Sequence, residues 1–78
     1  MMQETEVQDL ITQAIPNAEV AVFDTNGMRD HFRVWVSSKE FAGKNPIQRR
    51  QMVYKAVQVA FDDQRLHAVE ITTDVPED

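Results

Sequence analysis

The sequence predicts an α+β domain of order α-β-β-α-β, in which two helices pack on one face of a three-stranded mixed sheet. Three observations lead to this prediction. Two segments carry apolar residues at helical spacing, a central segment alternates clearly between apolar residues and polar or aromatic ones, and turn residues separate these segments. The chain has 78 residues, enough for one small domain, and we expect that domain to span residues 1–78.

The first third of the chain is expected to form a helix and then a strand. Apolar side chains recur at helical spacing over residues 3–15, and Pro16-Asn17 ends that helix. Residues 18–24 are rich in β-forming side chains and predict the first strand. The following Thr25-Asn26-Gly27 predicts a tight turn, because Asn and Gly tolerate positive φ.

Residues 30–38 predict the second strand, paired with the first as a hairpin. Phe32, Val34 and Val36 alternate with polar or aromatic residues and should face the helices. The opposite face of the sheet would then stay uncovered. Ala21, Phe23 and Trp35 would form an apolar patch there, open to a partner or to a second copy of the chain.

Asn45-Pro46 predicts the start of the second helix, as an N-cap followed by proline, and the helix should continue to residue 62. Its apolar stripe is predicted to be Ile47, Val53, Tyr54, Val57, Ala60 and Phe61. Its exposed side should carry Gln48, Arg49, Lys55 and Gln58. Residues 66–73 predict the third strand, with His67 on the same face as Val69, Ile71 and Thr73. The acidic residues 74–78 should form a frayed tail.

The composition excludes several kinds of protein. The chain has no cysteine, so disulfides, thiolate metal sites and cysteine nucleophiles are absent. No apolar run reaches the length of a membrane span, and the acidic N-terminus is unlike a signal peptide. We therefore expect a cytoplasmic protein without membrane contact.

Positive charge is concentrated in the middle of the chain. Residues 29–55 hold seven basic side chains and two acidic ones, whereas both flanking segments are strongly acidic. Candidate contacts for an anionic partner are Lys44, Arg49, Arg50 and Lys55 at the second helix, with Arg33 and Trp35 on the second strand. DNA binding through this helix is one interpretation. A solvated helix face is another, and the net charge of −5 disfavours tight nonspecific binding to nucleic acid.

The side chains give little support to an enzyme. Ser37 and Ser38 lack a nucleophile-elbow motif, and the sequence contains no phosphate-binding loop. The two histidines, His31 and His67, are too few for a closed metal site. Either could be an ordinary packed or exposed histidine, or could contribute to a metal centre whose other ligands come from another protein.

Four segments, in this order, resemble the BolA-like protein family. They are His31-Phe32-Arg33-Val34-Trp35-Val36-Ser37-Ser38, Phe41-Ala42-Gly43-Lys44, Gln48-Arg49-Arg50-Gln51-Met52-Val53-Tyr54 and Leu66-His67-Ala68-Val69-Glu70-Ile71. The resemblance spans nearly the whole chain. It implies an α-β-β-α-β fold related to the type II KH topology, in agreement with the order predicted above.

The resemblance also implies a function. Family members pair with a monothiol glutaredoxin carrying a Cys-Gly-Phe-Ser site, and such pairs hold a bridging [2Fe–2S] cluster with glutathione and the glutaredoxin cysteine on one side. The recurrent ligand on the BolA-like side corresponds to His67. Some members are described as DNA-binding transcriptional regulators linked to stress, which is the alternative function.

This chain departs from the family pattern at three places. The segment between the first two strands, residues 25–30, has neither the Cys nor the His that many members carry, so His31 would have to substitute. Arg49-Arg50-Gln51 replaces an Arg-His-Arg motif, and the nucleic-acid-gripping GxxG loop of KH domains is absent. The favoured hypothesis is a non-enzymatic adaptor, monomeric or weakly dimeric alone, that shares a cluster with a glutaredoxin and holds none by itself.

Overall fold

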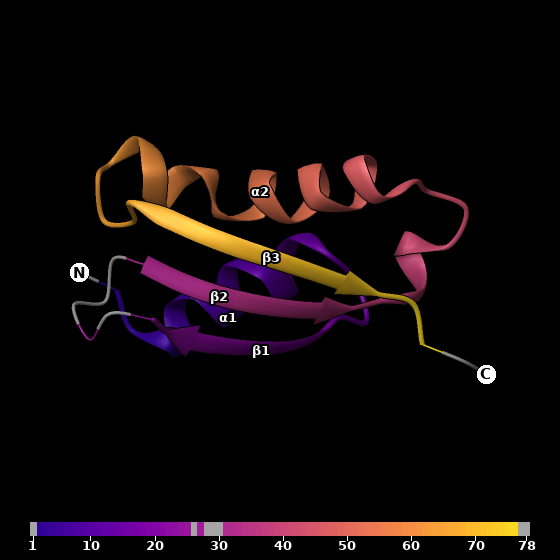
Figure 1. Cartoon of the computed structure of the whole chain (residues 1–78), viewed down its shortest axis with the longest axis horizontal. Helices are drawn as coiled ribbons and strands as arrows, with labels where there is room; N and C mark the ends of the chain where they lie inside the picture. Colours follow the sequence, from indigo (N-terminus) through magenta and orange to yellow (C-terminus); the bar gives the residue numbers. More distant parts are fainter. Residues whose placement is uncertain (1, 26, 28–30, 77–78) are drawn as a thin grey trace.

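The computed structural model describes residues 2–25, 27 and 31–76, and its elements follow the predicted order (Figure 1). They are α1 (Glu4–Ala14), β1 (Glu19–Asp24), β2 (His31–Ser37), the short 3-10 helix η1 (Lys39–Phe41), α2 (Pro46–Asp62) and β3 (Ala68–Asp74). The predicted order α-β-β-α-β is confirmed. Asn26, Asp30 and the last two residues of the predicted tail lie outside the described residues.

The sheet is mixed, as predicted, in the order β1-β2-β3. β1 pairs with β2 antiparallel, with Ala21 opposite Trp35. β3 pairs with β2 parallel, with His31 opposite Ala68. A parallel pair requires a long crossover connection, which η1 and α2 provide here.

Both helices cover the same face of the sheet, and the core lies between these two layers. Phe32, Val34 and Val36 of β2 are buried, as their alternation predicts. They pack with Ile11 from α1 and with Val57 from α2 in one hydrophobic cluster. The sheet face away from the helices carries Phe23 and Trp35, and Phe23 is 56% exposed. This matches the predicted apolar patch.

The N-terminal ends of α1 and α2 are capped by side chains. Asn45 accepts a hydrogen bond from the Gln48 N–H (2.8 Å), and the Gln48 side chain accepts one from the Asn45 N–H (3.0 Å). Gln3 and Glu6 form the same kind of reciprocal pair at α1. These boxes satisfy backbone donors that have no partner inside the helix. Gln3 is the N-cap of α1, and Glu4 is its first helical residue.

The apolar stripe of α2 differs from the prediction at two positions. Ile47 is 66% exposed and Tyr54 is 41% exposed, while Met52 and Ala56 pack against the core instead. Tyr54 stacks on Phe61, with ring centroids 5.1 Å apart. The helix therefore presents a partly apolar outer side that the periodicity alone had assigned to the core.

Ser38 joins two loops through its buried hydroxyl. Its Oγ donates to the Pro16 carbonyl (2.9 Å) and accepts from the Glu40 N–H (3.1 Å). We expect Ser38→Ala to lower the free energy of unfolding by about 1–3 kcal/mol, since the Pro16 carbonyl and the Glu40 N–H both lose the buried hydroxyl as a partner. Urea denaturation measures this. Thr12→Ala removes an exposed bond to the Asp9 carbonyl and should change stability by less than about 0.5 kcal/mol, so equal effects would contradict the account.

Candidate functional site

The two histidines of the chain lie together at one end of the molecule. Their ring centroids are 6.1 Å apart and the rings are nearly perpendicular, at 85°. The register explains this contact, because His31 is level with Ala68 and His67 directly precedes that residue. Two residues separated by 36 positions in the sequence therefore become neighbours through the parallel pairing of β2 and β3.

His67 lies in a different position from the one predicted. The sequence placed it inside the third strand on the same face as Val69, whereas it precedes β3 and is exposed. Leu66, immediately before it, is buried and anchors the turn. The imidazole of His67 is therefore accessible from outside, while His31 is half-buried beside it.

The turn that delivers His67 has a defined hydrogen-bonded structure. Gln64 adopts a left-handed conformation (φ 66°), and its N–H donates to the Phe61 carbonyl at 3.1 Å. The Leu66 N–H then reaches back to the Ala60 carbonyl at 3.0 Å. This arrangement resembles a Schellman ending, which reverses the chain after a helix. It turns the chain from α2 into the start of β3, next to the start of β2.

Arg65 stabilises the same turn through acidic side chains. Its Nε lies 2.9 and 2.8 Å from the two carboxylate oxygens of Asp63, and its guanidinium is 3.6 Å from Glu6 of α1. The hydrogen bond from Arg65 lowers the pKa of the Asp63 carboxyl below its usual value. Asp63 is therefore an anion at neutral pH, as its ion pair with Arg65 requires.

The histidine pair fits a shared metal centre better than a complete one. A ring nitrogen lies about 2 Å from a metal that it binds, so two rings on one metal have centroids roughly 5–6 Å apart. The observed separation of 6.1 Å lies just above this range, so a small rotation of one ring would bring the pair into it. Among the described residues, no group of three or more His, Asp or Glu side chains is placed to hold a metal ion. The remaining ligands would have to come from another molecule.

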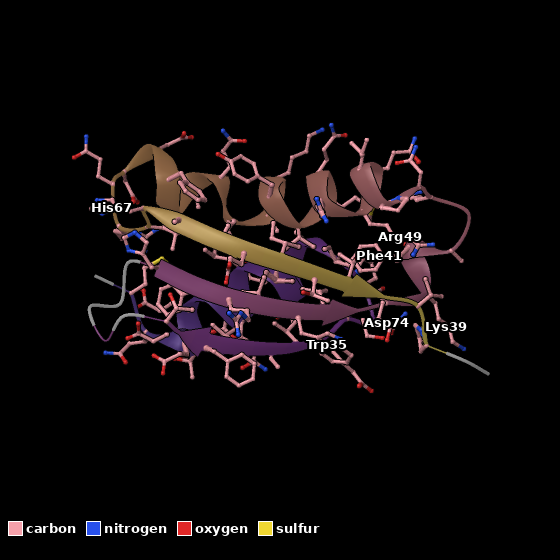
Figure 2. All side chains as sticks on the ribbon, in the orientation of Figure 1. Trp35, Lys39, Phe41, Arg49, His67 and Asp74 are labelled. Carbon is pink, nitrogen blue, oxygen red and sulfur yellow. The ribbon has the colours of Figure 1, made fainter. Side chains whose placement is uncertain are left out.

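The predicted basic residues do not surround the histidines. Figure 2 shows His67 near one end of the molecule and Arg49 toward the other, along a longest dimension of 36 Å. An α-helix rises about 1.5 Å per residue, so Arg50 lies roughly 18 Å along the axis from the end of α2 that leads to His67. That separation exceeds the Debye length of about 8 Å at physiological salt. The basic helix therefore contributes little to the charge around His67.

The candidate contact residues fall into three separate groups. Arg49 is half-buried, and its Nε donates to the Phe41 carbonyl at 3.1 Å, so it supports the loop before α2. Arg33 lies with Trp35 on the sheet face away from the helices, and its Nε is 3.1 Å from Glu70. Arg50 and Lys55 are exposed on α2, and Lys44 is exposed in the loop before it. Sequence reasoning listed these residues together, and the fold separates them.

Comparisons with known proteins agree with this architecture. The sequence model of the family described as "BolA-like protein" matches residues 4–78. The acid stress protein IbaG of Escherichia coli K12 is 31% identical over 75 residues, covering 96% of this chain and 86% of IbaG. The structure of BolA1 from Arabidopsis thaliana superposes with a TM-score of 0.83 at 24% identity, covering 97% and 94% of the two chains. Yeast Fra2 superposes at 0.73 with 30% identity, covering 92% and 77%.

No helix in residues 2–25, 27 and 31–76 combines the length and apolar character needed to cross a bilayer.

Proposed function

The chain belongs to the BolA-like family, and from that premise we propose that it is a non-enzymatic adaptor that shares a [2Fe–2S] cluster with a monothiol glutaredoxin. The observation that supports this most strongly is that His67 is exposed and lies beside His31, with 6.1 Å between their ring centroids. The pair places two imidazole rings at one accessible end of the molecule. It lacks the further ligands that a resident metal ion requires within the described part of the chain.

His67 is the primary ligand in this proposal, and His31 is the candidate for a second contact. The glutaredoxin thiolate and a bound glutathione would supply the other side of the cluster. An imidazole in place of a thiolate makes the cluster less negative and raises its reduction potential, as at Rieske centres. The chain would thereby change the redox behaviour of a cluster that it does not hold by itself. The cytoplasm is the expected compartment.

Titration of a cluster-loaded monothiol glutaredoxin with this protein tests the proposal. We expect native mass spectrometry to show one copy of each protein with one [2Fe–2S] cluster and glutathione. Visible circular dichroism should change in parallel and saturate at equimolar protein. If the cluster-loaded glutaredoxin keeps its own spectrum and mass at a tenfold excess of this protein, the proposal is wrong. Glutaredoxin without cluster is the control, and it separates protein association from cluster sharing.

A further inference from the structure

The groove between α2 and the free edge of β3 lies outside the histidine site. It has a volume of about 600 Å³ and is lined by Arg50, Gln51, Tyr54, Lys55, Gln58 and Ile71. One side is the outer face of α2 and the other is β3, which pairs within the described residues with β2 alone. In Figure 1, α2 runs alongside β3, the edge strand of the sheet. The proposed function assigns no role to this surface.

The backbone of β3 offers hydrogen-bonding groups along this edge. The Ser38 N–H donates to the Asp74 carbonyl at 3.2 Å, so the backbone groups of Asp74 face β2. In a parallel strand, the N–H and C=O of one residue point to the same side, and this side alternates along the strand. Val69, Ile71 and Thr73 consequently direct their N–H and C=O groups outward. Such an edge can pair with another extended chain.

The side chains of the groove indicate what kind of chain would pair there. Ile71 and Tyr54 provide an apolar floor, and Tyr54 is held in place by its stacking on Phe61. Arg50 and Lys55, five residues apart on α2, lie about 140° apart around the helix axis and line opposite flanks of its groove-facing wall. No ion pair joins either cation to an acidic side chain among the described residues. A glutamate would suit this wall, with its methylenes on the apolar floor and its carboxylate at either cation.

We infer that the α2–β3 groove binds an extended acidic peptide segment of a partner protein, which adds a fourth strand to the sheet at β3. Backbone hydrogen bonds to Val69, Ile71 and Thr73 provide affinity, and Arg50 and Lys55 select for acidic side chains. A second copy of this chain is a poorer occupant. Antiparallel pairing of two β3 strands would place the Arg50 and Lys55 walls of both copies along the same seam, where like charges repel.

The test uses a fluorescein-labelled seven-residue peptide of alternating glutamate and valine, blocked at both ends, in low salt. Fluorescence anisotropy should show saturable binding. Amide hydrogen exchange followed by NMR should show new protection of the Val69, Ile71 and Thr73 N–H groups. Protection should not rise at Glu70 or Thr72, whose N–H groups already face β2. An alternating lysine and valine peptide should not bind.

Three controls separate strand addition from other contacts. The double variant Arg50→Gln with Lys55→Gln should weaken binding at least tenfold. The pair Gln8→Glu with Gln13→Glu changes the net charge equally on exposed positions of α1 and should have less than a twofold effect. A peptide N-methylated on alternate residues keeps its side chains but loses the donors for the strand edge, and it should not bind.

Several results would overturn the inference. Equal binding of the N-methylated peptide would exclude strand addition, and absence of binding at millimolar peptide would exclude the site. If a seven-nucleotide oligothymidine binds more tightly than the acidic peptide and protects the N–H groups of Val69, Ile71 and Thr73, the groove is a nucleic-acid site. A dimer in sedimentation analysis with these amides already protected would assign it to a second copy. None of these outcomes depends on cluster sharing at His67.

Discussion

Replacing His67 with alanine is expected to abolish the histidine-ligated cluster in the complex with a monothiol glutaredoxin. The variant loses the exposed imidazole of the histidine pair. Changes to residues that merely support metal ligands cost about 10–100-fold in affinity, so loss of the ligand itself should exceed that range. Visible circular dichroism of the equimolar mixture should then show the spectrum of the glutaredoxin cluster alone.

Two further variants make this result specific. His31→Ala should weaken the shared cluster less than His67→Ala, because His31 is half-buried and stands behind the exposed ring. Asp62→Ala removes an exposed carboxylate at the end of α2 and should leave the spectrum unchanged. A His67→Ala spectrum identical to that of the unaltered complex would exclude His67 as a ligand.

Phe41→Ala should be the most destabilising of the simple truncations. Phe41 is completely buried in the connection before α2, and its carbonyl accepts the hydrogen bond from Arg49. Truncating a buried phenylalanine costs about 3–5 kcal/mol. A domain of this size has a free energy of unfolding of about 4–12 kcal/mol, so a large part of the stability would disappear. Denaturation in urea, followed by far-ultraviolet circular dichroism, measures the loss.

Ile47→Ala is the matched control for Phe41→Ala. Ile47 lies six residues further along and is also a large apolar residue, but it is 66% exposed. Its truncation should change the free energy of unfolding by less than about 0.5 kcal/mol. Similar losses of unfolding free energy in both variants would contradict the burial of Phe41 and the exposure of Ile47.

Most of the fold was predictable because local signals and the global arrangement agree. Asn45-Pro46 predicts the start of α2, and the predicted end at Asp62 is also correct. The alternation of Phe32, Val34 and Val36 correctly assigns the buried face of β2. The helix start and the strand alternation each depend only on residues close together in the chain, so the sequence alone reveals them.

Other features depend on contacts between distant residues. Periodicity assigned Tyr54 to the core, but Met52 and Ala56 are the residues of α2 that pack against the core there. Met2 was not expected to pack, yet it is buried in the core. Arg49 was assigned to the solvent-exposed side, and its bond to the Phe41 carbonyl required knowing how the preceding loop folds back.

The candidate site was half predictable. The resemblance selected His67, and the short first loop left His31 as the possible second ligand. Their proximity depends on the parallel register that places His31 opposite Ala68, which no local pattern specifies. Aligning the starts of the second and third predicted strands would have been the signal that brings the two histidines together. The separation of the basic residues from His67 follows from the length of α2. The charge pattern along the sequence does not show this distance.

Pulsed electron paramagnetic resonance tests the central claim most directly. The protein is prepared with ¹⁵N-histidine, combined with unlabelled glutaredoxin, and the cluster is reduced. We predict strong ¹⁵N hyperfine coupling from an imidazole bound to iron, and its loss in the His67→Ala protein. A reduced cluster within the same complex that shows no coupling to ¹⁵N would contradict the assignment of His67 as a ligand.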